Sequence, residues 1–253
     1  MAREMPQLEG VQHHFVDVDG LRMHYAVAGP ADGEPVVLVH GWPQHWFVWR
    51  RVIPRLADRF RVIAPDLRGF GWTDAPDSSY GKDELGRDIA GLLRALDLEN
   101  VRLSGHDWGG LAAFWAAIEA PERVRSVTCF AIIHPWAKGR PTLGGVLAAA
   151  VYQPQIGMPF LGPALQRFTP FVHLPFLASG VYRTFLLREL RKRPPVGRME
   201  VPARLILGRN DPICTPEVNG GAAGRGIELE VVDGGHWLPE SKPDLVAERI
   251  ASA

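Results

Sequence analysis

The chain has 253 residues, of which 46% are hydrophobic and 22% are charged, a composition typical of a globular protein with one large domain. Its 28 basic and 28 acidic side chains cancel to a formal net charge of zero, so no long-range field is available to attract nucleic acid or anionic lipid. The sequence contains no stretch of about 18 consecutive apolar residues, and it therefore predicts no membrane span.

The cysteine content and the N-terminal segment favour a reducing compartment. The two cysteines, Cys129 and Cys214, lie far apart and show no metal-ligand spacing, so we expect neither a disulfide framework nor a metal site. Residues 1–10 lack the apolar segment of a secretory signal. We therefore expect a cytoplasmic protein that needs no cofactor and binds no nucleic acid, and the sequence leaves a homodimer open.

Short β-rich runs alternate with amphipathic helical stretches through the first half of the chain. Strands are predicted over residues 13–18, 21–27, 36–40, 61–64, 101–104 and 124–132, and helices over 46–56, 83–96 and 111–120. The pair Asp19-Gly20 between the first two strands is typical of a tight hairpin turn. The alternation that follows predicts an α/β fold, in which a mostly parallel central sheet carries helices on both faces.

The alternation stops after His134. Residues 135–200 are rich in proline, glycine, leucine and aromatic residues, and their helical periodicity is weak. Strands are predicted again over 203–207 and 227–232, followed by a helix over 243–251, whereas the glycine-rich residues 217–226 predict no helix. Since the interruption separates two halves of one sheet, we predict a core domain of residues 1–134 and 201–253 with a small inserted helical cap over 135–200.

The strand that ends at Ser104 leads directly into a helix through residues 105–110, Gly-His-Asp-Trp-Gly-Gly. This pattern indicates a nucleophile elbow, a turn so tight that the residues two before and two after the nucleophile must be small. Such a turn presents Asp107 at the carboxyl end of the sheet and at a helix N-terminus, which favours negative charge. An aspartate that merely caps the helix is the ordinary alternative, but Gly105 and Gly109 favour the nucleophile.

An aspartate at this position changes the chemistry from that of the commoner serine. A carboxylate is ionised near neutral pH, needs no base to attack, and suits displacement at an sp³ carbon with formation of an ester. Hydrolysis of that ester requires a base and an orienting acid. His236, in a glycine-rich loop after the last predicted strand, fits the base. Asp211, after the preceding strand, fits the acid, although an aspartate before Pro212 is also typical of a turn.

Stabilisation of an oxyanion requires two backbone N–H donors near the nucleophile. Trp108 directly follows Asp107 and supplies one. The other is expected after the strand over 36–40, in His40-Gly41-Trp42-Pro43, where Gly41 lets the backbone approach closely and the Trp42 N–H is the donor. Pro43 is expected to make this turn rigid through a cis bond.

Together these motifs resemble the epoxide hydrolases of the α/β-hydrolase superfamily, and the resemblance covers essentially the whole chain. The motifs in order are His40-Gly41-Trp42-Pro43, Gly69-Phe70-Gly71-Trp72-Thr73, Gly105-His106-Asp107-Trp108-Gly109-Gly110, Asn210-Asp211-Pro212 and Gly235-His236-Trp237. The resemblance implies a covalent hydroxyalkyl ester on the aspartate, hydrolysed by water that the histidine activates. The substrate-binding residues expected on these loops are His40, Trp42, Pro43, His106, Trp108 and Trp237.

The tyrosines of the sequence help to predict the class of substrate. Epoxide hydrolases of this type use two cap tyrosines that hold the epoxide oxygen and protonate the alkoxide as it forms, and a tyrosine is a neutral donor at pH 7. Of the four tyrosines here, Tyr152 and Tyr182 lie in the predicted cap, and their Tyr-Gln and Tyr-Arg contexts resemble those of the family. The resemblance therefore implies that both are catalytic.

Two alternatives stay open. The same elbow and loop motifs occur in haloalkane dehalogenases, which need donors to the departing halide; Trp108 fits one, and Trp42 or Trp136 would have to supply the other. A non-catalytic ligand-binding protein on a hydrolase fold is an alternative of another class. We hypothesise an epoxide hydrolase that converts lipophilic or aryl epoxides to vicinal diols, because tryptophans adjoin several of the motif loops and predict an aromatic pocket wall.

Overall fold

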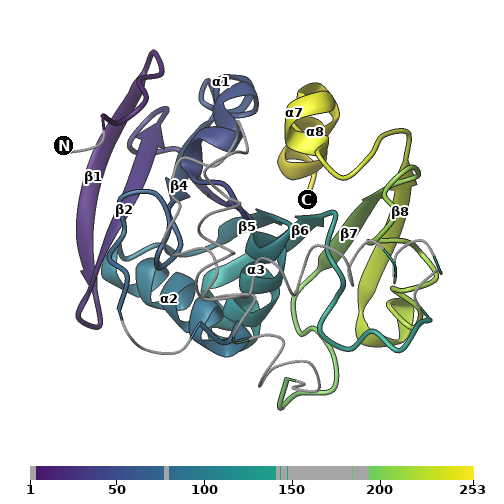
Figure 1. Cartoon of the computed structure of the whole chain (residues 1–253). Helices are drawn as coiled ribbons and strands as arrows, with labels where there is room; N and C mark the ends of the chain where they lie inside the picture. The colour runs from purple at the N-terminus through teal and green to yellow at the C-terminus, as the bar shows by residue number, and fades with distance from the viewer. Residues whose placement is uncertain (1–3, 77–79, 141–142, 144–146, 148–183, 185–193) are drawn as a thin grey trace.

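The computed structural model describes residues 4–76, 80–140, 143, 147, 184 and 194–253. One eight-stranded sheet lies at the centre of this part of the chain, with the strand order β1-β2-β4-β3-β5-β6-β7-β8 (Figure 1). Its strands are Val11–Val18 (β1), Leu21–Ala28 (β2), Glu34–Val39 (β3), Phe60–Pro65 (β4), Val101–His106 (β5), Val124–Phe130 (β6), Ala203–Gly208 (β7) and Ile227–Val232 (β8).

The pairing of the strands confirms the predicted topology. β1 and β2 form an antiparallel hairpin whose turn contains Asp19 and Gly20 in left-handed conformations (φ 52° and 85°). β2 also pairs antiparallel with β4, and every pair from β4 through β3, β5, β6 and β7 to β8 is parallel. The fold is therefore α/β with a mostly parallel sheet, and the carboxyl ends of six strands meet at one edge.

Helices cover both faces of the sheet. Figure 1 shows α2 (Lys82–Ala95) and α3 (Trp108–Glu119) on one face, and α1 (Ile53–Leu56), α7 (Leu238–Ser241) and α8 (Pro243–Ala251) on the other. Short 3₁₀ helices occur at Trp46–Arg51, Pro121–Arg123 and Ala223–Arg225.

Each face has its own hydrophobic core, and β3 shows how one strand serves both. Val37 and Val39 belong to the core beneath α2 and α3, whereas Val36 and Leu38 belong to the core beneath α1 and α8. Successive side chains of a strand point to opposite faces, so a strand buried on both sides is a continuous apolar run. Each such buried side chain stabilises the fold by roughly 1.5–3 kcal/mol.

The boundaries differ from the predicted ones where backbone constraints intervene. The helix expected over 46–56 is a 3₁₀ helix at Trp46–Arg51 followed by the short α1, because Pro54 lacks an N–H and suits the first turn of a new helix. β6 ends at Phe130, two residues before the predicted end, since Ala131 adopts a positive φ of 49°. α3 begins at Trp108, three residues before its predicted start, so Gly109 and Gly110 lie in its first turn.

The stretch predicted as a cap falls between two neighbouring strands. β6 and β7 pair with each other although residues 131–202 separate them in sequence. Most of residues 135–200 lie outside the described residues, so the helical cap stays a prediction. Among the residues that are described, no helix combines the length and the apolar character needed to cross a membrane.

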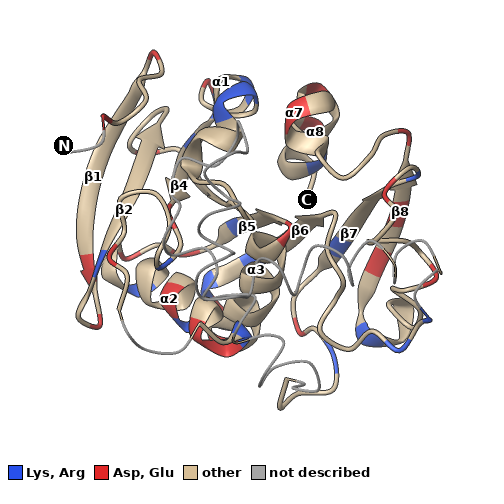
Figure 2. Ribbon diagram, in the orientation of Figure 1, with Lys and Arg blue, Asp and Glu red and all other residues tan. Residues whose placement is uncertain are grey.

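Acidic and basic residues are interspersed on the same elements, as Figure 2 shows for α2. Several of them pair across elements: Arg50 with Glu240, Arg55 with Asp244, and Arg249 with Glu230. The mixed distribution agrees with the zero net charge and gives the described surface no extended field of one sign.

Candidate active site

Four of the predicted site residues lie at the carboxyl ends of parallel strands. Trp42 follows β3, Asp107 follows β5, Asp211 follows β7 and His236 follows β8. These ends meet at one edge of the sheet, and hydrogen bonds and an ion pair join the four residues there. The structure thus brings together residues that are 194 positions apart in the sequence, which is the distance from Trp42 to His236 (236 − 42).

Asp107 occupies the sharp turn between β5 and α3. Its backbone has φ 53° and ψ −129°, a conformation rarely adopted by a residue with a side chain. The turn is so tight that a Cβ on Gly105 would lie 2.3 Å from the Gly109 carbonyl oxygen, and a Cβ on Gly109 would lie 2.2 Å from the Val39 carbonyl oxygen. Both positions therefore require glycine, as expected for a nucleophile elbow.

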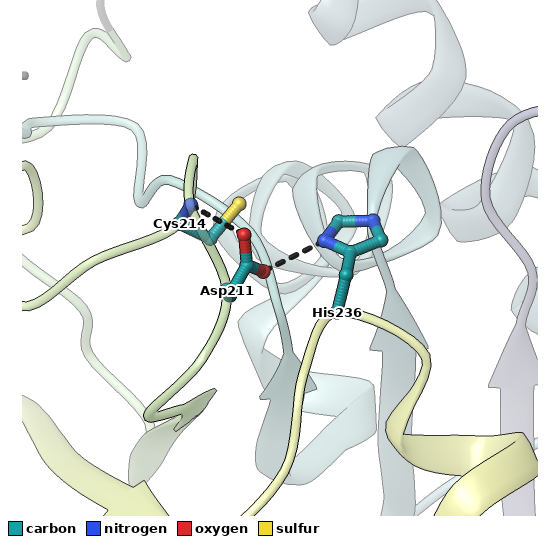
Figure 3. A group of neighbouring side chains, drawn as sticks. All are labelled: Asp211, Cys214 and His236. Atoms are coloured by element: carbon teal, nitrogen blue, oxygen red, sulfur yellow. Dashed lines mark hydrogen bonds and ion pairs between the residues drawn. The ribbon is translucent and has the colours of Figure 1, made fainter. Parts of the chain in front are cut away.

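His236 lies between two carboxylates. Its Nδ1 donates a hydrogen bond of 2.7 Å to Oδ2 of Asp211, and its Nε2 lies 3.5 Å from Oδ2 of Asp107 (Figure 3 shows the first of these bonds). The other oxygen of Asp211 accepts the N–H groups of Ile213 (2.9 Å) and Cys214 (3.0 Å), so this carboxylate is fixed in the turn after β7. The imidazole is therefore held by its Nδ1 while its Nε2 faces Asp107.

The carboxylates control the protonation of the imidazole. Burial lowers the pKa of His236, but its side-chain hydrogen bonds with Asp107, Asp211 and Cys214 and the charge of Asp107 outweigh burial and raise this pKa well above its ordinary value. Burial raises the pKa of Asp211, but the His236 hydrogen bond outweighs it, and the pKa of Asp211 lies below its usual range. The two carboxylates therefore favour the protonated form of the His236 imidazole.

This arrangement predicts a measurable effect on His236. In Asp107→Ala, the pKa of His236 should be lower than in the unmodified chain, because the hydrogen bond and the charge of Asp107 that raise it are gone. The ¹⁵N chemical shifts of the imidazole, followed by NMR as the pH is raised, report the change. Asp244→Ala removes an exposed carboxylate from α8 and should leave the titration of His236 unchanged. Equal midpoints in Asp107→Ala and the unmodified chain would contradict the assignment.

The loop after β3 directs a backbone donor at Asp107. The Trp42 N–H donates a hydrogen bond of 2.8 Å to Oδ1 of Asp107, and the Trp42–Pro43 peptide bond is cis. Gly41 packs directly on Asp107, since a Cβ at position 41 would lie 2.5 Å from the Asp107 Cβ and 2.6 Å from its Oδ1. The second expected donor, the Trp108 N–H, begins α3 one residue after Asp107.

Gly41→Ala is expected to lower kcat by about a hundredfold or more, because the new methyl group must displace either the Asp107 carboxylate or the Trp42 donor. The rate with a saturating substrate measures the effect. Gly224→Ala, at a position where a Cβ would meet no atom within 4 Å, is the matched control and should retain full activity. An active Gly41→Ala variant would show that the close approach is not needed.

Two histidines that the sequence predicts as substrate-binding lie beneath the site. His40 is fully buried; its Nε2 accepts the Leu67 N–H and its Nδ1 donates to the Gly41 carbonyl oxygen. His106 is also fully buried and donates from Nε2 to the His236 carbonyl oxygen at 2.8 Å. Burial, and next the charge of His236, lower the pKa of His106 to about 4, so this ring is neutral. Both rings hold backbone groups of the loops around Asp107, and their assignment as substrate-binding residues stays a prediction.

Asp66 was not among the predicted site residues, yet it fixes the same edge of the sheet. Its side chain is fully buried and accepts hydrogen bonds from the Trp46 N–H (2.8 Å), the Trp72 N–H (3.1 Å) and His24 Nδ1 (2.7 Å). Burial raises the pKa of Asp66, but the His24 hydrogen bond outweighs it and lowers the pKa below its usual range. Its position directly after β4, at the carboxyl end of a parallel strand, is the sequence signal that marks it.

The structure also describes the contacts of Trp237, Trp136 and Ser104. Trp237 is 43% exposed and packs edge-on against His236, with ring centroids 5.1 Å apart. The Trp136 indole N–H donates to the Val196 carbonyl oxygen at 2.8 Å, so it is not directed at Asp107. Ser104 is buried and donates to the Thr128 carbonyl oxygen.

Tyr152 and Tyr182 lie outside the described residues, so their catalytic assignment stays a prediction. A metal-binding group, in contrast, can be sought among the described side chains. One oxygen of Asp211, Sγ of Cys214 and one ring nitrogen of His236 all lie within 4.8 Å of one another (Figure 3).

The sequence of the chain is similar to those of known proteins. A family model described as the alpha/beta hydrolase fold matches residues 34–156. The soluble epoxide hydrolase of Corynebacterium sp. (strain C12) is 47% identical over 109 residues, which cover 43% of this chain and 37% of that protein. The chain thus spans less than half the length of the curated relatives it matches.

Solved structures match over nearly the whole chain. Epoxide hydrolase CorEH is 30% identical, with a TM-score of 0.77 and coverage of 96% of this chain and 98% of that one. A loop variant of the haloalkane dehalogenase DbeA from Bradyrhizobium elkanii has a TM-score of 0.75 at 23% identity, covering 96% of this chain and 95% of that one, a likeness that shows the fold alone. By its sequence and its fold, the chain belongs to the epoxide hydrolase family of the α/β-hydrolase superfamily.

Proposed function

We propose that the protein hydrolyses lipophilic or aryl epoxides to vicinal diols through an ester on Asp107. The observation that carries the proposal is the placement of an elbow carboxylate between a backbone donor and a histidine: Oδ1 lies 2.8 Å from the Trp42 nitrogen, and Oδ2 lies 3.5 Å from Nε2 of His236. An aspartate in this position attacks carbon without a base, and the histidine serves the later hydrolysis.

In the first half of the reaction, Oδ2 of Asp107 attacks a ring carbon and the carbon–oxygen bond of the epoxide breaks. The departing alkoxide takes a proton from Tyr152 or Tyr182, which hold the epoxide oxygen. Oδ1 keeps its hydrogen bond to the Trp42 N–H and becomes the carbonyl oxygen of the ester. The donor is therefore in place before the oxyanion forms on that same atom.

Formation of the ester also prepares the base. Esterification removes the charge of Asp107, one of the groups that raise the pKa of His236, so the imidazolium then loses its proton more readily. That proton converts the tyrosinate back to neutral tyrosine. The neutral imidazole, held at Nδ1 by Asp211, accepts a proton from water at Nε2 as the water attacks the ester carbon.

Collapse of the tetrahedral intermediate completes the cycle. The Trp42 and Trp108 N–H groups stabilise the negative charge on Oδ1 while the intermediate exists. The bond between Cγ of Asp107 and the oxygen that carries the substrate then breaks, and this oxygen takes the proton of the hydroxyl that the water added to Cγ. The diol leaves, and Asp107 is again a carboxylate beside an imidazolium. The overall reaction adds one water to one epoxide, and it uses no cofactor.

We favour epoxide hydrolysis over haloalkane dehalogenation because of the two predicted cap tyrosines and the hydrogen bond of Trp136. A dehalogenase needs a second halide donor besides Trp108, and the Trp136 N–H is already bonded to a backbone carbonyl, so Trp42 would have to supply it. The experiment is a panel of aryl epoxides, alkyl epoxides and bromoalkanes, with diol and halide measured separately. Diol without halide supports the proposal, halide release without diol supports a dehalogenase, and saturable binding without turnover supports a ligand-binding protein.

Replacing the tyrosines tests the assistance to the leaving oxygen. Tyr152→Phe combined with Tyr182→Phe should slow ester formation by about 10²–10⁴-fold, since general acid catalysis contributes that much. Single-turnover kinetics of adduct formation on Asp107 measures this step. Tyr80→Phe, which removes a hydroxyl bonded to the Pro76 carbonyl oxygen, is the control and should leave the rate unchanged. A double variant with an unchanged alkylation rate would contradict the role of the pair.

A further inference from the structure

We propose that Asp211, Cys214 and His236 form a binding site for one thiophilic divalent cation, Zn²⁺ or Cd²⁺, and that the bound ion inhibits the protein at the hydrolysis of the ester. The three side chains offer a carboxylate oxygen, a thiol sulfur and a ring nitrogen, all within 4.8 Å of one another (Figure 3). Binding of the ion is independent of the proposed function, whereas inhibition depends on it.

The turn after β7 places the thiol beside the carboxylate. Oδ1 of Asp211 accepts the N–H of Cys214 at 3.0 Å, which closes a short turn and brings the two side chains to the same side. His236 reaches the pair from the loop after β8 and donates from Nδ1 to Oδ2 of Asp211 at 2.7 Å. Asp211 and Cys214 are each only 3% exposed, so these two ligands lie away from bulk solvent.

The donor set selects the metal. A thiolate with an imidazole and a carboxylate suits Zn²⁺ and its softer analogue Cd²⁺, and disfavours Mg²⁺ and Ca²⁺, which take oxygen ligands. Three protein ligands and one water complete the tetrahedral geometry that zinc prefers. The cysteine spacing in the sequence predicts no metal site, because it does not reveal that the fold adds Asp211 and His236 to a single cysteine.

The surroundings of the three ligands match those of metal sites. A metal-ligating histidine usually donates its other ring N–H to a carboxylate, and here Nε2 of His236 lies 3.5 Å from Oδ2 of Asp107. The oxygen of Asp211 that faces away from the histidine is held by the Ile213 and Cys214 N–H groups, which orient the carboxylate as a ligand. These outer partners are present before any ion binds.

Binding exchanges protons for the ion. The cation replaces the proton shared by Nδ1 of His236 and Oδ2 of Asp211 and displaces the Cys214 thiol proton, and both protons leave to solvent. The nitrogen and oxygen must move apart from 2.7 Å to about 3.4 Å, the separation that two zinc bonds of about 2.1 Å impose at a tetrahedral angle. His236 then keeps its remaining proton on Nε2, the nitrogen that would have to accept a proton from water.

Binding is tested with Cd²⁺ and the full chain. Isothermal titration calorimetry should give one Cd²⁺ per chain, and the ultraviolet charge-transfer band from thiolate to cadmium should appear with the same stoichiometry. The band should be absent from Cys214→Ser and present in Cys129→Ser, which changes the other buried cysteine. Asp211→Asn keeps the thiol and should bind Cd²⁺ at least about tenfold more weakly. Circular dichroism verifies that each variant is folded.

The outcomes of this test are distinct. A band that persists in Cys214→Ser, a band lost in Cys129→Ser, or no band in the unmodified chain would each overturn the site. Unchanged affinity in folded Asp211→Asn would remove that residue from the ligand set and overturn the three-ligand site as proposed.

Inhibition is tested by separating the two halves of the reaction. With Zn²⁺ bound, an epoxide should still alkylate Asp107 once, but diol formation should fall at least about a hundredfold, because only the second half uses Nε2. Intact mass spectrometry should show one adduct per chain, and Cys214→Ser should keep its own metal-free rate when Zn²⁺ is added. Turnover that continues with the ion bound would overturn the inhibition. If no epoxide reacts even without metal, the proposed function fails, and the charge-transfer band still decides whether the cation site exists.

Discussion

His236→Gln is expected to stop the reaction after one chemical event, with the substrate left as an ester on Asp107. Glutamine has no basic nitrogen, so water cannot be activated, but alkylation by Asp107 does not use the imidazole. Turnover should fall at least about a thousandfold, as it does when a member of a hydrolytic triad is removed. Addition of an aryl epoxide followed by intact mass spectrometry should show one adduct per chain, and peptide mapping should place it on Asp107.

A control variant distinguishes the loss of the catalytic base from a loss of folding. His14→Gln changes an exposed histidine on β1 and should retain full turnover with no accumulated adduct. The loss of a positive charge next to Asp107 in His236→Gln leaves the nucleophile more available, so slow alkylation is not expected. A folded His236→Gln protein that neither turns over nor forms an adduct with any epoxide would contradict an Asp107 ester as the intermediate.

The fold could be predicted because its signals are local. The alternation of β-rich and helical stretches and the Asp19-Gly20 turn depend on residues close in sequence, and both the hairpin and the parallel sheet are present. The errors in boundaries come from single backbone features that the pattern does not show. Ala131 takes a positive φ and ends β6, and Pro54 divides one predicted helix into two.

Part of the site could be predicted, because the sequence shows which motif follows which strand of the sheet. Asp107, Asp211 and His236 each follow a parallel strand, and since such strands end at one edge, their side chains meet. The burial of a side chain and its hydrogen-bond partners depend on residues that are distant in the sequence. The sequence could not show that His40 and His106 are covered completely, because each is enclosed by residues from distant segments.

The same limit explains the residues that the sequence analysis missed. Asp66 acts by accepting N–H groups from Trp46 and Trp72, and Cys214 is notable only because His236, 22 residues later (236 − 214), returns to its side. Neither residue belongs to a recognisable motif by itself. Contacts between segments, and not residue types, make them part of the site.

Removing the nucleophile should abolish activity completely. Asp107→Ala and Asp107→Gly both lack the carboxylate, so turnover should fall by about 10⁴-fold or more and no covalent adduct should form with any epoxide. Diol formation and intact mass spectrometry measure the two effects. An adduct in either variant, or residual turnover near that of the unmodified chain, would show that another residue attacks the epoxide.

The two variants should differ from each other in stability, because the elbow requires a backbone conformation that only glycine adopts without strain. A residue with a Cβ at φ 53° and ψ −129° is strained by roughly 1–3 kcal/mol, whereas glycine avoids this strain and loses roughly 0.5–1 kcal/mol through the greater freedom of its unfolded chain. Asp107→Gly should therefore have a free energy of unfolding about 1 kcal/mol above that of Asp107→Ala, measured by urea denaturation. Comparing two variants that both lack the carboxylate removes the loss of the His236 ion pair from the difference.

The pair Arg87→Gly and Arg87→Ala supplies the control of opposite sign. Arg87 is an exposed residue in the interior of α2, and glycine there should give a free energy of unfolding roughly 0.5–1 kcal/mol below that of alanine. If glycine destabilises the protein at both positions, the elbow is not strained. If glycine stabilises only at position 107, the fold holds Asp107 in an unfavourable conformation, and the side chain that makes the ester is kept there at the expense of stability.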